Sequence, residues 1–182
     1  MGFDQPVIRV ATPDDEAAVD ALMKESAAAL FPLFYDERQA ASASRYVAQF
    51  DPMLLADGTY FVLESGGELV ACGGWSRRDK LHTGSGDSGS DARALDPSYE
   101  PARVRAMFVR ADWTRRGFGR RILEECEAAA RREGFKQFIL TATLPGLPLY
   151  LAYGFEPLED VEVTMPDGVT IACVSMGKRI DD

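Results

Sequence analysis

The stretch WTRRGFGRR, from Trp113 to Arg121, places four arginines around two glycines in a chain that is acidic overall. The residues before it, Arg103 to Arg110 (RVRAMFVR), alternate in polarity and are rich in β-formers, which predicts a strand. The residues after it, Gly117 to Glu133, repeat apolar side chains on one helical face, and Gly134 follows them, which predicts a helix. The stretch is therefore expected to form a turn from a strand into a helix.

This turn has the features of an anion-binding site. The first turn of a helix leaves backbone N–H groups without intrahelical acceptors and carries a partial positive charge. Gly117 and Gly119 lack the side chains that would keep a ligand away from the backbone, and arginines flank them on both sides. The pattern favours a pyrophosphate group as the ligand. The alternative is a basic helix start that binds nothing.

The common nucleotide-binding motifs fit the turn poorly. A Walker A loop requires a Lys after the glycines, and a dinucleotide-binding fingerprint requires a third glycine where Ile122 stands. That fingerprint also follows the first strand of its fold, whereas earlier strands are expected here. A nucleotide-binding protein is therefore the weakest of the functions considered.

Composition limits the class of protein. A length of 182 residues suits a single domain covering 1–182, and a net charge of −9 disfavours a nucleic-acid partner. We find no apolar run of the roughly 18 residues that a membrane helix needs and no secretory signal, so we expect a cytoplasmic protein without a membrane partner.

The cysteines and the histidine point to no metal or hydrolytic site. Cys72, Cys126 and Cys173 are far apart in apolar surroundings, which is typical of reduced core thiols. The single histidine, His82, borders a Ser/Gly/Asp-rich stretch and is expected to be solvated. No metal is predicted.

Patterning along the whole chain predicts an α/β fold with one mixed sheet and helices on both faces. Residues 78–101 are expected to form an exposed, flexible loop, either a disordered excursion or a flap over the substrate site. The expected strands are residues 7–10, 59–64, 68–75, 103–110, 135–143, 155–164 and 169–176. The expected helices are one that Thr12 and Pro13 open, 37–50, 117–133 and 147–153.

Two segments, in the right order and spacing, resemble one family. Arg115-Arg116-Gly117-Phe118-Gly119, following Met107-Phe108-Val109, is similar to the acyl-CoA signature Gln/Arg-x-x-Gly-x-Gly/Ala of the GNAT acetyltransferase superfamily. Leu149 to Phe155 (LYLAYGF) is similar to the family's segment aromatic-Tyr-x-x-x-Gly-Phe. Thr114 departs from the Gln/Arg of the first motif position. The resemblance implies a mostly antiparallel sheet of about six to seven strands.

The resemblance also implies acetyl-CoA as acyl donor. It implies that strands 103–110 and 135–143 splay apart to admit the pantetheine arm, which would pair with the backbone of the first strand. Thr143 stands where many members place an Asn that contacts the cofactor. The cofactor-binding residues implied are Phe108, Val109, Arg115, Arg116, Gly117, Phe118, Gly119, Arg120 and Thr143.

Catalytic roles follow from the same resemblance. Tyr150 would lie near the thioester sulfur, and a phenol with a pKa of about 10 is protonated at neutral pH and able to act as general acid. The alternative is that Tyr150 is a packed aromatic residue. Many family members have a Glu on this strand that acts as general base. This chain has Arg103 at the matching position, and Glu100 is a weak substitute.

The resemblance leaves the acceptor open. Phe34, in an aromatic cluster, and Trp75 lie on segments that shape the acceptor site in the family, so a small-molecule or peptide amine with some apolar surface is expected. Homodimers are common in the family, and the hairpin 155–176 would supply the surface. The second function considered is a non-catalytic acyl-CoA-binding or sensing domain.

Overall fold

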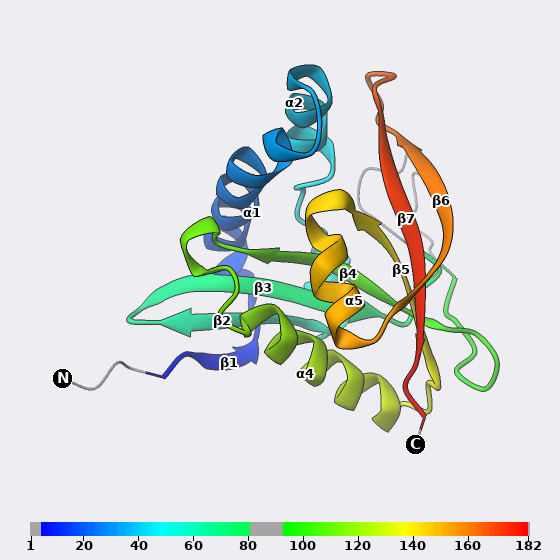
Figure 1. The fold of residues 1–182 in the computed structure, drawn as a ribbon. Helices are drawn as coiled ribbons and strands as arrows, with labels where there is room; N and C mark the ends of the chain where they lie inside the picture. Colours follow the sequence, from blue (N-terminus) through cyan, green and yellow to red (C-terminus); the bar gives the residue numbers. More distant parts are fainter. Residues whose placement is uncertain (1–4, 81–92, 182) are drawn as a thin grey trace.

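The computed structural model describes residues 5–80 and 93–181. Within these ranges, seven strands form one sheet in the order β1-β2-β3-β4-β5-β7-β6 (Figure 1). Only the β4–β5 pair is parallel, so the expected mixed, mostly antiparallel sheet is confirmed. The strands are β1 (Val7–Val10), β2 (Tyr60–Ser65), β3 (Glu68–Ser76), β4 (Ala102–Val109), β5 (Gln137–Thr143), β6 (Glu156–Thr164) and β7 (Thr170–Arg179).

Helices cover both faces of the sheet, as predicted. The helices α4 and α5 share one apolar cluster, which includes Ile122, Phe138 and Tyr150, while α1, α2 and α3 pack into a second cluster with Tyr60 and Cys72. The α-helices are α1 (Glu16–Leu30), α2 (Glu37–Tyr46), α3 (Pro52–Ala56), α4 (Phe118–Arg132) and α5 (Leu147–Tyr153). The 3-10 turns are η1 (Pro13–Asp15), η2 (Phe31–Leu33), η3 (Ala111–Trp113) and η4 (Leu144–Gly146).

The helix expected over 37–50 is present but shorter than predicted. The helix α2 ends at Tyr46, and a separate short helix, α3, begins at Pro52. Proline disfavours helical backbone in the residue before it, and Asp51 is indeed extended, at φ −112° and ψ 106°. The Asp51 carboxylate accepts a hydrogen bond from the Met53 N–H at 3.0 Å, so it caps the new helix.

The three cysteines are buried free thiols. Burial raises the pKa of Cys72 to about 12 and that of Cys173 to about 11, and it raises the pKa of Cys126 further. Each thiol is therefore protonated at neutral pH. Across the described ranges, no helix combines the length and apolarity needed to cross a membrane.

The described ends of the 78–101 segment are hydrogen-bonded to each other. Arg78 and Ala94 form an antiparallel bridge, and the Leu95 N–H donates to the Arg77 carbonyl at 2.8 Å. Leu95 is 6% exposed and belongs to the core. The two ends therefore leave the sheet side by side. Of residues 78–101, which were predicted to form a flexible loop, residues 81–92, His82 among them, lie outside the described residues.

Candidate active site

The sheet opens between its two central strands. The parallel strands β4 and β5 are paired at Ala102 with Phe138 and at Arg103 with Ile139. Further along, β5 continues beside β7, where Thr143 pairs with Cys173. Figure 1 shows the two strands diverging, with α5 at the opening. The chain thus has the splayed pair of strands that the sequence predicted.

A bulge shapes the β4 side of this opening. Phe108 pairs with Cys72 and Arg105 with Gly74, so β4 has one more residue than β3 over this interval. Ala106 adopts a positive φ of 51° at the bulge. The Tyr60 hydroxyl donates to the Ala106 carbonyl at 2.9 Å and stabilises this backbone.

The bulge leaves the backbone of Val109 directed into the opening. The Arg110 N–H donates to the Val70 carbonyl of β3 at 2.9 Å. Because main-chain groups alternate in direction along an antiparallel strand, those of Phe108 point to β3 and those of Val109 point away from it. The buried Ser26 hydroxyl of α1 donates to the Val109 carbonyl at 2.8 Å. Of the two residues predicted to offer backbone here, Val109 is the one whose main-chain groups point away from β3.

The turn before α4 leads from a strand into a helix, as expected from WTRRGFGRR. The turn from Arg115 to Gly117, with the first turn of α4, is called the cradle below. Arg115 and Gly117 both have positive φ, 63° and 82°, and α4 begins at Phe118. The Arg121 N–H bonds to the Gly117 carbonyl at 3.1 Å and starts the helical hydrogen-bond ladder. The earlier N–H groups of the first turn are therefore available to an anion.

The two glycines of the cradle have different physical roles. A Cβ on Gly117 would meet nothing within 4 Å, so its requirement is the left-handed backbone. A Cβ on Gly119 would lie 2.8 Å from Cδ2 of Leu149, so this glycine allows α4 to pack against α5. Sequence reasoning had attributed both glycines to ligand access, but the space at Gly119 is filled by the protein itself.

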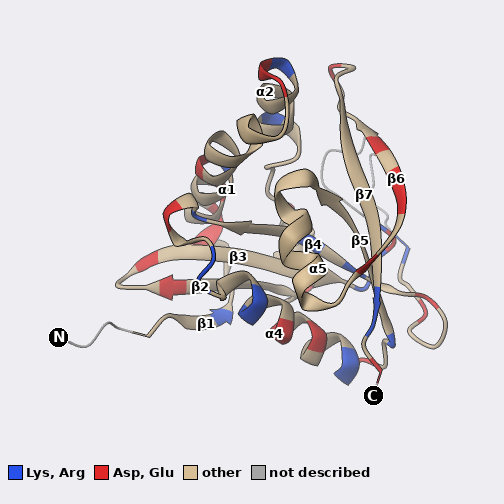
Figure 2. Cartoon of the chain, in the orientation of Figure 1, with Lys and Arg blue, Asp and Glu red and all other residues tan. Residues whose placement is uncertain are grey.

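The arginines of the turn are held by aromatic and polar neighbours. The Arg116 guanidinium lies 4.6 Å from the Trp113 ring centre, and that of Arg120 lies 5.3 Å from the Tyr153 ring centre. Arg121 instead donates to the Pro6 carbonyl at 2.8 Å and fastens the N-terminal segment. Figure 2 shows basic residues gathered where α4 begins.

Tyr150 lies in α5 beside the end of β5. The residue is 8% exposed, and burial raises its pKa well above the ordinary value for a phenol. Gly146 adjoins both Tyr150 and Thr143, since a Cβ there would lie 3.1 Å from Cε2 of Tyr150 and 3.7 Å from Oγ1 of Thr143. Within residues 5–80 and 93–181, no group accepts the Tyr150 hydroxyl proton. Tyr150 is thus a neutral phenol at neutral pH.

Arg103, which stands where the family often has a Glu that acts as base, and Glu100, the weak substitute, are both engaged in ion pairs. Arg103 donates to the Pro101 carbonyl at 2.8 Å and to Asp79 at 3.1 Å. Glu100 receives two hydrogen bonds of 2.7 Å from Arg93, which hold its pKa at about 2. A carboxyl with this pKa is a poor proton acceptor at neutral pH.

A buried ion pair beside the site was missed by sequence reasoning. Arg105, 2% exposed, donates to Asp51 at 2.9 Å, and the Lys80 ammonium lies 3.3 Å from the same carboxylate. The only signal was alternation in RVRAM, which places Arg105 on the same face of β4 as Arg103. Asp51 and Lys80 come from distant segments, so the pairing depends on the tertiary structure.

The two residues predicted to contact the acceptor are not brought together. Phe34 is 47% exposed between α1 and α2. Trp75 is 1% exposed and packs edge to face against Phe135, with ring centres 5.7 Å apart. This burial places Trp75 in the core under α4.

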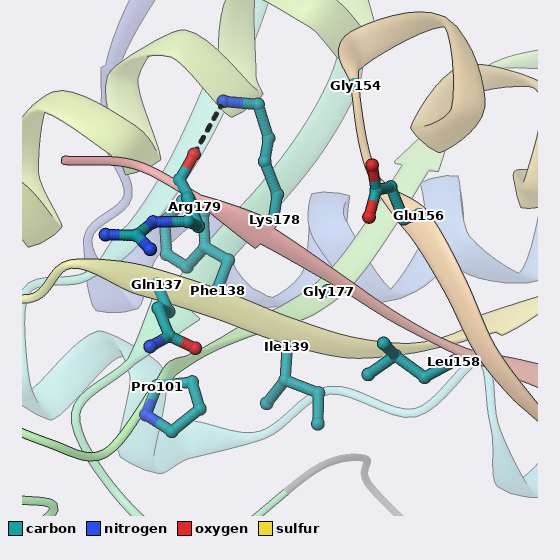
Figure 3. A pocket seen from close by; sticks show the side chains of 10 residues that line it. All are labelled: Pro101, Gln137, Phe138, Ile139, Gly154, Glu156, Leu158, Gly177, Lys178 and Arg179. Atoms are coloured by element: carbon teal, nitrogen blue, oxygen red, sulfur yellow. Dashed lines mark hydrogen bonds between the residues drawn. The ribbon is translucent and has the colours of Figure 1, made fainter. Parts of the chain in front are cut away.

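An open groove of about 470 Å³ lies at the other end of β5 from Thr143. Figure 3 shows it between the starts of β5 and β6 and the end of β7, with Ile139 and Leu158 on one side and Glu156 and Lys178 on the other. It is separate from the opening between β4 and β5. Across the described ranges, no group of three or more His, Cys, Asp or Glu side chains is arranged to hold a metal ion.

Known structures share this architecture at low sequence identity. A GCN5-related N-acetyltransferase from Rhodopseudomonas palustris is 18% identical, with 98% of each chain covered and a TM-score of 0.73. The PaiA N-acetyltransferase from Thermoplasma acidophilum, solved with coenzyme A, is 14% identical, with coverage of 96% of this chain and 99% of that one and a TM-score of 0.68. YncA from Salmonella typhimurium, solved with its cofactor acetyl-CoA, is 15% identical, with coverage of 98% and 96% and a TM-score of 0.64.

Sequence comparison gives the family. The model of the acetyltransferase (GNAT) domain matches residues 56–157, which include β4, the cradle and α5. No curated protein sequence gives a significant match. The fold and the matched domain define an acyltransferase. The chain belongs to the GNAT acetyltransferase family.

Proposed function

We propose that this protein transfers the acetyl group of acetyl-CoA to a primary amine by direct attack, with both substrates bound at once. The observation that carries the proposal is the opening between β4 and β5. The backbone of Val109, which points away from β3, lies on one side of it, the helix-start cradle lies at its end, and Tyr150 lies beside it. The coenzyme A and acetyl-CoA in the PaiA and YncA structures support the choice of donor.

The residues present fit this donor. The N–H and C=O of Val109 offer an extended ligand the pairing that a further strand would make, and the pantetheine arm carries amides that suit it. The first-turn N–H groups of α4 suit a pyrophosphate, and Arg116 adds positive charge beside them. When bound, acetyl-CoA would supply an acetyl group activated as a thioester.

Tyr150 serves as the general acid in this proposal. Its raised pKa keeps the phenol protonated throughout the neutral range, so the hydroxyl is able to donate a hydrogen bond to the departing sulfur. The N–H of Val109 is available to the carbonyl oxygen as negative charge develops there.

The amine is expected to arrive neutral. Arg103 occupies the strand position at which the resemblance places a basic Glu, and Arg93 neutralises Glu100. Only a neutral amine is a nucleophile, so kcat/KM should increase with pH up to the pKa of the acceptor. The buried thiols do not serve as nucleophiles because burial keeps them protonated.

Two measurements test the proposal. Isothermal titration with acetyl-CoA tests the cradle, and thiol release from acetyl-CoA across a panel of polyamines, amino acids and peptides tests turnover. The Tyr150→Phe variant should bind acetyl-CoA within about twofold of the unmodified protein and lose about a hundredfold or more in kcat, the range expected for loss of a general acid. Full activity in this variant would remove the acid role.

The second candidate is a non-catalytic acyl-CoA-binding or sensing domain. Arg103 favours it, since this side chain replaces the expected base and is held by Asp79. Binding of acetyl-CoA without thiol release from any amine of the panel would select this function. Absence of binding would contradict both candidates.

A further inference from the structure

The hydroxyl of Tyr35 links three distant segments of the chain by hydrogen bonds. Its hydroxyl donates to the Ala172 carbonyl of β7 at 2.8 Å and accepts from the Leu144 N–H at 2.9 Å. The ring is 8% exposed and packs edge to face against Phe31, with ring centres 6.0 Å apart. The position of this hydroxyl is therefore well defined.

Leu144 begins the turn that carries the proposed acid. It follows Thr143, the last residue of β5, and starts η4, which leads directly into α5. Beyond Ile139, β5 has left β4, so its last residues lack the support of that neighbour. An N–H at the start of a helical turn also lacks an intrahelical acceptor. The Tyr35 hydroxyl supplies that acceptor where the strand is otherwise least supported.

The segment that carries Tyr35 also contacts the other side of the opening. The helix α1 runs directly into η2 and then Tyr35, and its Ser26 bonds to the Val109 carbonyl on β4. One continuous segment is thus bonded to the free edge of β4 and to the end of β5. Its two hydroxyls hold the two sides of the opening at a set separation.

We propose that Tyr35 is a positioning residue for catalysis, which places the turn before α5 and with it the Tyr150 hydroxyl. The proposal rests on the acetyl transfer proposed above. Tyr35 touches neither substrate in this scheme and acts through Leu144. Because Gly146 of this turn adjoins the Tyr150 ring, a shift of the turn moves that ring.

The kinetic test uses Tyr35→Phe, which removes one oxygen atom and keeps the ring. The kcat for thiol release, with the most active amine of the panel, should fall about tenfold to a hundredfold, as expected for misplacement of a catalytic group. The Kd for acetyl-CoA should change by less than about threefold. In a Tyr150→Phe background, Tyr35→Phe should lower kcat by less than about a further twofold, because both substitutions remove the same contribution of Tyr150.

Tyr153→Phe is the matched control. Tyr153 lies on α5, as Tyr150 does. The substitution removes a hydroxyl that donates to Glu127 of α4 at 2.8 Å and does not contact Leu144. Its kcat should stay within about twofold, with a melting temperature lowered about as much as in Tyr35→Phe. If the two variants lose kcat equally, or if the losses from Tyr35→Phe and Tyr150→Phe multiply fully, the positioning role is wrong.

Amide hydrogen exchange separates failure of this inference from failure of the proposed function. With acetyl-CoA present, peptides covering 143–150 should exchange faster in Tyr35→Phe than in the unmodified protein, and those covering 118–132 should be unchanged. Unchanged exchange over 143–150 would overturn the inference. Faster exchange there, in a protein that turns over no amine, would contradict the proposed transfer and leave Tyr35 as the anchor of this turn.

Discussion

Gly117→Ala tests the cradle through its backbone conformation alone. Gly117 has φ of 82°, and a Cβ at this position would meet nothing within 4 Å. The substitution therefore creates no collision, and its cost is that of holding alanine in the left-handed region, about 1–2 kcal/mol. If the free turn relaxes to avoid this strain, acetyl-CoA must restore the original turn in order to bind. Since about 1.4 kcal/mol is a factor of ten, Kd should increase about fivefold to thirtyfold.

Gly168→Ala is the control for this prediction. Gly168 lies between β6 and β7 with φ of 85°, and a Cβ there would also meet nothing within 4 Å. The same backbone cost should appear wholly as lost stability, lowering the melting temperature by about 2–4 °C per kcal/mol, with Kd for acetyl-CoA unchanged. Titration calorimetry and thermal unfolding measure both quantities. Equal affinity for acetyl-CoA in the two variants, with equal losses of stability, would refute the assignment of the cradle.

Three further predictions follow from packing and charge. Gly119→Ala should destabilise the fold by about 1–3 kcal/mol by crowding Leu149, and a second change, Leu149→Ala, should cost less in that background than alone; full additivity in urea unfolding would argue against this contact. Hydrogen bonds from Arg9 lower the pKa of Asp15 to about 2. The stability that this ion pair gives to the fold is therefore complete above about pH 4 and is lost as the pH falls to about 2. Asp15→Asn should therefore remove about 1–2 kcal/mol at pH 6 and almost nothing at pH 2, and an equal loss at both pH values in urea titrations would contradict the ion pair. The thiols Cys72, Cys126 and Cys173 should not react with a thiol reagent at pH 8 until the protein unfolds, and rapid labelling of the native protein would show that one is accessible.

Local patterns predicted most of the fold. The strand before WTRRGFGRR, the amphipathic helix after it and the turn residues between the hairpin strands each depend on neighbours in the chain, and each is confirmed. The helix expected over 37–50 begins where predicted but ends at Tyr46, and Asp51 and Pro52 then start a separate short helix.

The sequence by itself determined the turn from a strand into a helix start and the order of strands and helices, because these depend on residues within a few positions of each other. Only the tertiary structure decided that Leu149 fills the space beside Gly119, that Trp75 is buried, and that Asp51 neutralises Arg105. It also decided that the hydroxyl of Tyr35 reaches the N–H of Leu144, 109 positions away. Contacts of this range arise when separate segments pack against one sheet, and the pattern around either residue does not contain them.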